Sequence, residues 1–270
     1  MNILHIEDEP WDSGMAHYAV TLAAEQLRHG HRVEFWGRAD SPVLSEARRL
    51  GLAARGWTGG AAGLLTWGFQ RRAASIFSPR VINAHTGSAH VLALALAGRT
   101  CAVVRTRGDA RMPKAGILTR FVAARTNAFI AVNRLLEAAL KSVFPGAKVA
   151  LVAQGIDGPA HAAVLPAAPV VGMVARLDPV KGHETLIDAI ARLKPKIPGL
   201  RVRCAGAGRL RARLREKLNS AGLAGVVEFP GRVADPGAFM AACRVGVAPS
   251  LGSEAVSRAV LEWMARNPPS

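Results

Sequence analysis

The sequence lacks the features of a membrane-spanning or exported protein. None of its apolar runs reaches the roughly 18 uncharged residues that a transmembrane helix needs. The N-terminal stretch Met1–Pro10 has no Lys or Arg before its apolar residues, and acidic residues follow where the hydrophobic part of a signal peptide should continue. We therefore expect a cytoplasmic protein.

Cysteine is also scarce. The 270 residues include three cysteines, Cys101, Cys204 and Cys243, which are widely separated and odd in number. Their spacing matches no cysteine metal site and gives no sign of a disulfide framework. We expect reduced thiols inside the core of a cytosolic protein.

Acidic residues are rare in one part of the chain. Between Gly51 and Ala150 we count 14 Lys and Arg residues against two acids, Asp109 and Glu137, and the formal charge of the whole chain is +16. Such a surface attracts an anionic partner. Nucleic acid, anionic lipid and a phosphorylated glycan all fit, and the charge alone does not rank them.

Strands and helices alternate along the first half of the sequence. A strand at Asn2–Ile6 is followed by a loop, a helix over 16–29 and a second strand at Arg32–Trp36. Further strands are expected at Val81–Ala84, Ala102–Arg105, Phe129–Val132 and Lys148–Val152, and helices at Leu118–Thr126 and Arg134–Val143. This alternation predicts a parallel sheet with helices on both faces.

The alternation stops at His161–Pro169, which has two prolines and no charged residue and which we interpret as an interdomain linker. It then restarts. Strands are expected at Val170–Val174, Arg201–Ala205, Val226–Phe229 and Val245–Ala248, and helices at His183–Leu193, Leu210–Leu218 and Pro236–Ala242. The sequence therefore predicts two Rossmann-like α/β domains, residues 1–162 and 163–270, whose parallel sheets face a cleft. Ligands of such sheets bind at the carboxyl ends of the strands, where Arg176, Lys181 and Glu254 fall.

The stretch Pro249–Glu262 combines turn residues with the start of a helix. We expect Glu254 in the turn and Glu262 about two turns along a helix that begins near Ala255. The free N–H groups of a helix start bind phosphate, and both carboxylates can accept hydrogen bonds from sugar hydroxyls. A nucleotide sugar offers all of these groups. From the spacing alone, a capped helix with two solvated acids is the commoner explanation.

Several motifs together resemble glycosyltransferase family 4, whose members are retaining enzymes with the GT-B fold. They lie at Gly172–His183, at Pro230–Val233 and at Pro249–Ala265. The resemblance implies that Arg176 and Lys181 hold the diphosphate of the donor. It also implies that Glu254 contacts the transferred sugar and Glu262 the ribose hydroxyls. Because fixed cations and N–H groups can stabilise a departing nucleoside diphosphate, we expect neither a metal nor another cofactor.

The first half carries further residues that match the family. Gly14 corresponds to the glycine-rich first loop, which usually has two glycines. His85 lies where many relatives place a histidine near the donor sugar, with His90 as the alternative and a packing role open for both. Arg105 and Arg107 follow a strand directly. We expect them to bind an anionic acceptor, unless they are ordinary surface charge.

Two basic segments allow more than one interpretation. The stretch Leu64–Arg72 combines Trp67 and Phe69 with Arg71 and Arg72, which would suit a membrane-interface element, although a partly buried helix is commoner. The basic helix around 209–217 is better interpreted as a solvated face than as a nucleic-acid reader.

The sequence departs from the family after Met264 and Ala265. Relatives continue with a strand and several helices, one of which crosses back to the first domain, whereas here Arg266–Ser270 ends the chain. We therefore expect a C-terminally truncated second domain, and the activity of this chain stays open.

The sequence thus predicts a retaining hexosyl- or heptosyltransferase for an envelope glycan or a lipopolysaccharide core. It would work at the cytoplasmic face of the membrane, with an anionic membrane surface as a further partner and without nucleic acid. The basic first half motivates an anionic acceptor, whereas the envelope setting comes from the resemblance. The alternatives are a soluble transferase acting on a small acceptor and a non-catalytic binder of nucleotide sugar or nucleic acid.

Overall fold

The computed structural model describes residues 1–11, 13–57, 66–109, 111–114, 116–156, 164–252 and 257–266. The chain divides between Gly155 and Ile156 into two compact units. The domain boundary expected at residue 162 and the first part of the expected linker lie outside the described residues.

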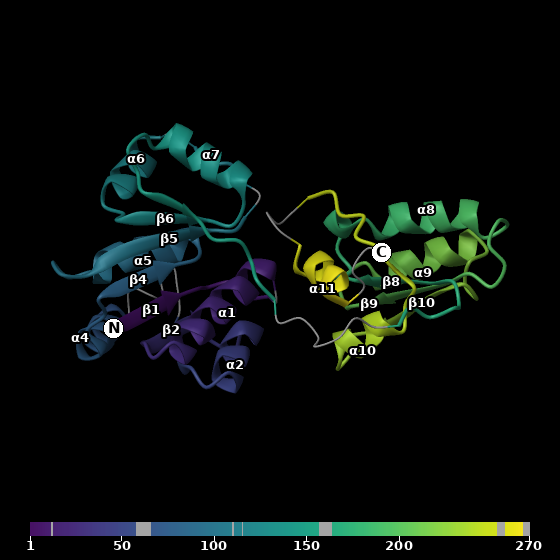
Figure 1. Cartoon of the computed structure of the whole chain (residues 1–270), viewed down its shortest axis with the longest axis horizontal. Helices are drawn as coiled ribbons and strands as arrows, with labels where there is room; N and C mark the ends of the chain where they lie inside the picture. The colour runs from purple at the N-terminus through teal and green to yellow at the C-terminus, as the bar shows by residue number, and fades with distance from the viewer. Residues whose placement is uncertain are drawn as a thin grey trace. The chain divides into compact units, whose positions relative to one another are not determined.

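The first unit is built on a seven-stranded parallel sheet in the order β3-β2-β1-β4-β5-β6-β7 (Figure 1). Its strands are β1 (Asn2–Ile6), β2 (Arg32–Arg38), β3 (Ala53–Trp57), β4 (Val81–Ala84), β5 (Ala102–Arg107), β6 (Ala128–Ala131) and β7 (Val149–Leu151). In β1, Ile3 pairs with Val33 of β2 and with Val81 of β4. The strand order therefore reverses at β1, which is where sheets of this kind bind ligands.

Helices cover both faces of this sheet. They are α1 (Gly14–Arg28), α2 (Pro42–Arg49), α4 (Trp67–Phe77), α5 (Gly87–Leu96), α6 (Ile117–Ala124) and α7 (Arg134–Val143). Successive side chains of a strand point to opposite faces. Ile3 accordingly packs in the cluster under α1 and α2, whereas Leu4 and Ile6 pack in the cluster under α4 and α5. Burial on both faces explains why these strands read as continuous apolar runs.

The second unit has a four-stranded parallel sheet in the order β10-β9-β8-β11 (Figure 1). The strands are β8 (Val170–Val174), β9 (Arg201–Ala205), β10 (Val227–Gly231) and β11 (Val245–Gly246). The helices are α8 (His183–Leu193), α9 (Arg211–Ser220), α10 (Pro236–Ala241) and α11 (Arg258–Arg266), and a 3-10 turn lies at Pro179–Lys181. One core cluster joins Met173 to Ile190 and Leu214 of α8 and α9, and another joins Phe239 of α10 to Trp263 of α11.

The structure confirms the α/β class and most of the expected elements. The strands at Asn2–Ile6, Val81–Ala84, Val170–Val174 and Arg201–Ala205 have the expected bounds. The edge strand β3 and the helix α2 were not predicted. Ala53–Trp57 includes arginine and glycine and is only partly buried, so it lacks the apolar run of a central strand.

The cysteines are free thiols, as expected. Cys204 and Cys243 are buried, and Cys101 is half-buried. Burial raises the pKa of Cys204 to about 12, so this thiol stays protonated at neutral pH.

Candidate functional site

Three loops of the second unit converge where its strand order reverses. They follow β8, β9 and β11, and they include 175–182, 206–208 and 247–252 respectively. The reversal lies between β9 and β11, on either side of β8, so the loops meet at the carboxyl end of that strand. This is the position at which open parallel sheets bind ligands.

Two of these loops pack backbone against backbone. The Leu251 N–H donates to the Val180 carbonyl oxygen at 2.8 Å. Gly182 has a φ of +75°, and a Cβ atom added to it would lie 2.7 Å from the carbonyl carbon of Pro249 and overlap the oxygen. Only glycine fits here, because the position combines a left-handed conformation with a close approach.

Glycines of the third loop approach the first in the same way. A Cβ on Gly206 would lie 2.9 Å from the Ala175 carbonyl carbon, and one on Gly208 would lie 2.8 Å from the Leu177 carbonyl carbon. The Leu177 N–H also donates to the Ala207 carbonyl oxygen at 3.0 Å. The Gly-Ala-Gly turn therefore lies flat against the loop that carries Arg176.

The two expected diphosphate ligands both lie in the loop after β8. Arg176 is half-buried, and its guanidinium makes no hydrogen bond or ion pair with any described residue, although its carbonyl oxygen accepts from the Asp178 N–H at 2.8 Å. Lys181 is 8% exposed and ends the 3-10 turn, which Asp178 caps by accepting from the Val180 N–H at 3.4 Å. The structure thus brings both cations onto one short loop.

This loop leads directly into α8, whose N-terminus has no side-chain cap. Gly182 is the N-cap residue, so the first N–H groups of the helix have no capping oxygen from it. The first residue, His183, is buried, and neither ring nitrogen has a partner among the described residues. Burial lowers the pKa of His183 to about 4, so the ring is neutral at physiological pH. Sequence reasoning assigned it no role, although it follows the lysine-glycine pair directly.

Glu262 lies on α11 and already has a partner. Its Oε1 is 2.6 Å from Nε of Arg258, one helical turn earlier, and its side chain is 15% exposed. Glu254 and the helix start expected near Ala255 lie outside the described residues, and the helix that is described begins at Arg258. The expected roles of the two glutamates therefore stay predictions.

The position of α11 depends on Trp263. Its indole lies over two glycines, because a Cβ on Gly172 would be 2.7 Å from Cη2 and one on Gly246 would be 2.6 Å from Cε2. Gly172 belongs to β8 and Gly246 to β11. The absence of side chains at these two positions lets α11 pack directly on the strands next to the converging loops.

In the first unit, a polar cluster lies at the corresponding reversal between β1 and β4. Asp8 follows β1 and accepts hydrogen bonds from the hydroxyls of Thr86 and Ser88, which follow β4. Thr86 also caps α5 by accepting from the Ala89 N–H at 3.2 Å. These bonds connect the loop after β1 to the start of α5.

Gly14 is the first residue of α1. Ser13 is the N-cap, and its side chain accepts from the Ala16 N–H at 3.0 Å and donates to Glu9. Gly14 itself is buried. The expected close approach of a ligand to its backbone stays a prediction.

Both candidate histidines are held inside the unit. His85 is fully buried, and its Nε2 lies 3.0 Å from Nδ1 of His5. His90 Nε2 lies 2.8 Å from the hydroxyl of Thr126. Burial lowers the pKa of His85 well below its ordinary value and that of His90 to about 4. Both rings are therefore neutral near pH 7.

Arg105 is a buried cation rather than surface charge. Its guanidinium donates to the carbonyl oxygens of Ala84, at 3.1 Å, and of Thr106. Burial and the neighbouring Arg107 lower the pKa of Arg105 to about 9, and Asp109 partly offsets this. A carbonyl neutralises no charge, so the positive charge of Arg105 stays available to an anion at this edge.

Arg107 forms a smaller network at the end of β5. It donates to Asp109 at 3.0 Å and to the carbonyl oxygen of Arg111 at 2.6 Å. Its Nε is buried and has no partner among the described residues. The expected roles of Arg105 and Arg107 in acceptor binding stay predictions.

Glu7 is a buried carboxyl group that the sequence did not single out. It directly follows β1, is fully buried and accepts from the Glu9 N–H at 2.8 Å. Burial raises the pKa of Glu7 to about 8, so the group is mostly protonated at pH 7. The signal in the sequence was an acid immediately after a buried apolar strand.

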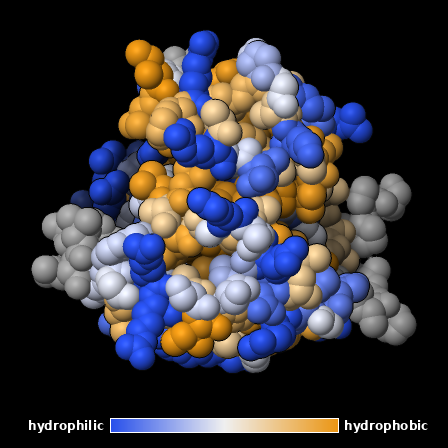
Figure 2. All heavy atoms as spheres, turned by 90° about the vertical axis from the view of Figure 1, so that its left-hand side faces the viewer, coloured by the Kyte–Doolittle hydropathy of each residue, from blue (hydrophilic) through white to orange (hydrophobic). Residues whose placement is uncertain are grey.

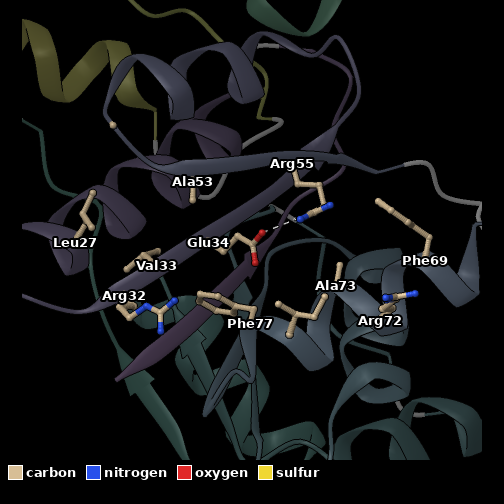
Figure 3. A pocket seen from close by; sticks show the side chains of 12 residues that line it. Leu27, Arg32, Val33, Glu34, Ala53, Arg55, Phe69, Arg72, Ala73 and Phe77 are labelled. Atoms are coloured by element: carbon tan, nitrogen blue, oxygen red, sulfur yellow. Dashed lines mark hydrogen bonds and ion pairs between the residues drawn. The ribbon is translucent and has the colours of Figure 1, made fainter.

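A cavity of about 480 Å³ lies in the first unit, next to the amino-terminal halves of β2 and β3 (Figure 3). Glu34 and Arg55 form an ion pair at 3.5 Å there, and the Arg55 guanidinium lies 5.5 Å from the ring centroid of Phe69 on α4, which lines the cavity together with Arg72. None of the expected site residues that the structure describes lines this cavity. It is therefore separate from the carboxyl ends of the strands.

Two helices of the first unit expose apolar side chains beside cations. On α4, Phe69 and Ile76 are exposed together with Arg71 and Arg72. Figure 2 views the unit from the side of α4 and the N-terminus, where hydrophobic and hydrophilic groups alternate.

The second of these helices, α6, was not singled out by the sequence. None of its residues is buried, and Ile117 and Leu118 are 92% and 75% exposed. Phe121 is also exposed, with the Arg125 guanidinium 3.6 Å from its ring centroid. No acidic residue occurs between positions 110 and 136. Exposed apolar side chains therefore lie beside cations along this helix.

The basic helix α9 has partners within the second unit. Arg213 lies 2.9 Å from Glu184, and Lys217 lies 2.7 Å from Asp188, both on α8. These cations therefore form ion pairs between α9 and α8 on an exposed face.

Among the described residues, no group of three or more His, Cys, Asp or Glu side chains is arranged to hold a metal ion. Within the same ranges, no helix is long and apolar enough to cross a membrane.

Family models match both halves of the chain. Residues 13–158 match the model described as Glycosyltransferase Family 4, and residues 168–270 match the one described as Glycosyl transferases group 1. A search of curated proteins gave no match.

Several solved structures share the fold. HepE from Anabaena, solved with UDP-glucose, has a TM-score of 0.79 and 20% identity, over 98% of this chain and 78% of that one. A glycosyltransferase from Rickettsia africae has a TM-score of 0.78 and 14% identity, over 98% and 77%. The lipopolysaccharide outer core galactosyltransferase WaaB has a TM-score of 0.66 and 13% identity, over 93% and 74%. The two parallel sheets are those of the GT-B fold.

Proposed function

This chain belongs to glycosyltransferase family 4, and we propose that it transfers a sugar from a nucleotide-sugar donor to an anionic envelope glycan or lipopolysaccharide-core acceptor, with retention of anomeric configuration. The observation that carries this proposal is the convergence of three glycine-containing loops beside Arg176, Lys181 and the uncapped N-terminus of α8.

The donor diphosphate fits this convergence for electrostatic reasons. As the bond between the anomeric carbon and the diphosphate oxygen breaks, negative charge accumulates on the departing nucleoside diphosphate. Arg176 supplies a cation without a competing partner among the described residues, and α8 supplies free N–H groups at the positive end of its dipole. Such fixed groups stabilise the departing anion without a metal. The UDP-glucose complex of HepE supports a donor of this class.

The acceptor is assigned to the first unit. Arg105 and Arg107 lie at the carboxyl end of β5, next to the reversal of the sheet, and no carboxylate of the described residues is hydrogen-bonded to Arg105. An anionic glycan would compensate this buried charge. The similarity to WaaB supports an envelope acceptor. A hexose or heptose is the sugar class that we propose.

A peripheral position on an anionic membrane completes the proposal. Exposed apolar side chains on α6 would enter the interface, while Arg120 and Arg125 would meet anionic headgroups. Membrane association would place the enzyme near a lipid-linked acceptor.

Thermal unfolding with a panel of UDP-, GDP- and ADP-sugars tests the donor assignment first. The matching nucleotide sugar should raise the melting temperature, since a ligand of the native state stabilises it, and the protein should then hydrolyse or transfer that donor in EDTA. No shift with any donor, combined with salt-sensitive binding to duplex DNA, would instead favour the nucleic-acid binder. A donor that binds without turnover would identify a non-catalytic binder.

A further inference from the structure

A chain of three polar side chains lies between α1 and the sheet of the first unit. Oε1 of Gln26 on α1 is 2.7 Å from Nε2 of His5 on β1. Nδ1 of the same ring is 3.0 Å from Nε2 of His85, which directly follows β4. Both rings are fully buried and nearly parallel, with an angle of 16° between their planes. The remaining nitrogen, Nδ1 of His85, is buried and has no partner among the described residues.

Both rings are neutral at physiological pH. Burial lowers the pKa of His5 to about 4, and burial, together with the electrostatic effects of His5 and Arg105, lowers the pKa of His85 well below its ordinary value. A neutral imidazole carries one N–H donor and one bare nitrogen acceptor. The hydrogen bonds along this row of side chains can therefore run in either direction. Their direction is set by whether the group at the end of the row donates or accepts.

We propose that Gln26 fixes the tautomers of both histidines and makes Nδ1 of His85 a hydrogen-bond acceptor. The Gln26 oxygen can only accept, so the proton of His5 lies on Nε2. His5 Nδ1 is then bare and accepts from the Nε2–H of His85, which leaves His85 Nδ1 without a proton. Gln26 and His5 are positioning residues that act through His85.

This assignment defines the ligand group that His85 can receive. A bare imidazole nitrogen accepts from a hydroxyl, whereas it would repel another acceptor such as a phosphate oxygen. His85 lies at the reversal of the sheet, and the family resemblance already implies a histidine near the donor sugar. Resting on the proposed function, the bare Nδ1 would accept from a sugar hydroxyl that reaches it and would not bind the diphosphate. Because His85 is neutral and its Nε2–H is directed at His5, it has no proton to donate to the ligand.

Proton–nitrogen correlation spectra of the ligand-free protein with isotope-labelled histidine test the assignment directly, because they separate protonated from bare ring nitrogens. We expect the proton on Nε2 of both His5 and His85, with signals assigned through single histidine substitutions. A proton on His85 Nδ1 would overturn the proposal, since it would mean that the Gln26 amide donates and that every bond runs the other way. This result does not depend on whether the protein transfers sugar.

Variants separate positioning from general packing. Gln26→Met removes the acceptor at the end of the chain, so the two histidines should exchange between tautomers and the His85 Nδ1 signal should move toward the protonated position. Gln70→Met is the matched control, because Gln70 is a buried amide of the same unit whose side chain bonds to Thr66 at 2.8 Å rather than to a histidine. The histidine signals of the Gln70→Met protein should stay at their positions in the unsubstituted protein. Equal shifts in both variants, or none in Gln26→Met, would contradict the proposal.

Discussion

Gly182 and Pro249 touch through their backbones, at a place where a Cβ atom on Gly182 would lie 2.7 Å from the Pro249 carbonyl carbon. This contact joins the loop that carries Lys181 to the loop that leads toward Glu254. Residues that are far apart in the sequence thereby become neighbours, and the proposed donor site depends on that contact.

Gly182→Ala should destabilise the second unit and weaken nucleotide binding. The left-handed conformation costs an L-residue about 1 to 2 kcal/mol, and the overlap with Pro249 should add roughly 1 to 3 kcal/mol. Gly222→Ala is the control, because Gly222 has a φ of +64° but open space around it. Chemical denaturation should show the larger loss for Gly182→Ala. Equal losses would mean that the Pro249 contact relaxes without cost.

Arg176→Ala should lower the affinity for a nucleoside diphosphate by about 1.5 to 3 kcal/mol, the range for hydrogen bonds to charged groups. The Arg176 guanidinium has no partner among the described residues, so its removal should leave the melting temperature nearly unchanged. Arg192→Ala removes an exposed cation of the same unit and serves as the control. Titration calorimetry gives the affinities. Identical affinities for the Arg176→Ala and Arg192→Ala proteins would show that Arg176 does not bind the donor diphosphate.

Gly246→Ala should displace Trp263 and with it α11. A methyl group there would lie 2.6 Å from Cε2 of the indole, and overpacking of this kind costs roughly 1 to 3 kcal/mol. Gly225→Ala has open space and no positive φ, so it should be nearly neutral. Hydrogen exchange along 258–266 should be faster only in Gly246→Ala. Unchanged exchange would show that the packing of the Trp263 indole on Gly246 does not stabilise α11.

Glu7→Gln should change how the stability of the protein depends on pH. The folded state raises the pKa of Glu7 from 4.5 to about 8, so between these values the folded protein holds a proton that the unfolded chain has lost. The stability contributed by the neutral carboxyl group is therefore complete below pH 4.5 and is lost as the pH rises toward 8. Glutamine does not titrate, so the Glu7→Gln protein should not lose this stability as the pH rises.

Urea unfolding midpoints from pH 5 to 8 measure the effect, with Glu25→Gln, a half-exposed surface carboxylate, as the control. The midpoint of the Glu7→Gln protein should rise relative to the unsubstituted protein as the pH increases. Parallel curves for the two proteins would mean that Glu7 ionises normally.

Replacing Ile117 and Phe121 of α6 by serine should weaken binding to anionic vesicles. Loss of two large apolar contacts should reduce partitioning by at least about tenfold, if each contributes on the order of 1 kcal/mol. Leu135→Ser removes an exposed leucine from α7 and is the control. Co-sedimentation should also fall with salt, because exposed charges are screened. Equal binding to neutral vesicles would argue against the electrostatic part of the proposal.

The sequence by itself determined the α/β class, most strands and helices, and the loops that carry Arg176 and Lys181. Strands buried on both faces read as apolar runs, and helix ends are marked by local residues such as the N-cap Ser13 and Asn133. These signals are local, so they can be read without knowing the fold. The edge strand β3 escaped because a partly exposed strand has no such run.

Only the tertiary structure decided which groups meet and in what state. Burial, which depends on the whole packed unit, keeps Glu7 protonated and His85 neutral and turns Arg105 from a surface cation into an internal one. The chain from Gln26 through His5 to His85 joins residues up to 80 positions apart. No sequence spacing encodes these relationships, because a pKa and a hydrogen-bond direction are set by neighbours that only the folded chain supplies.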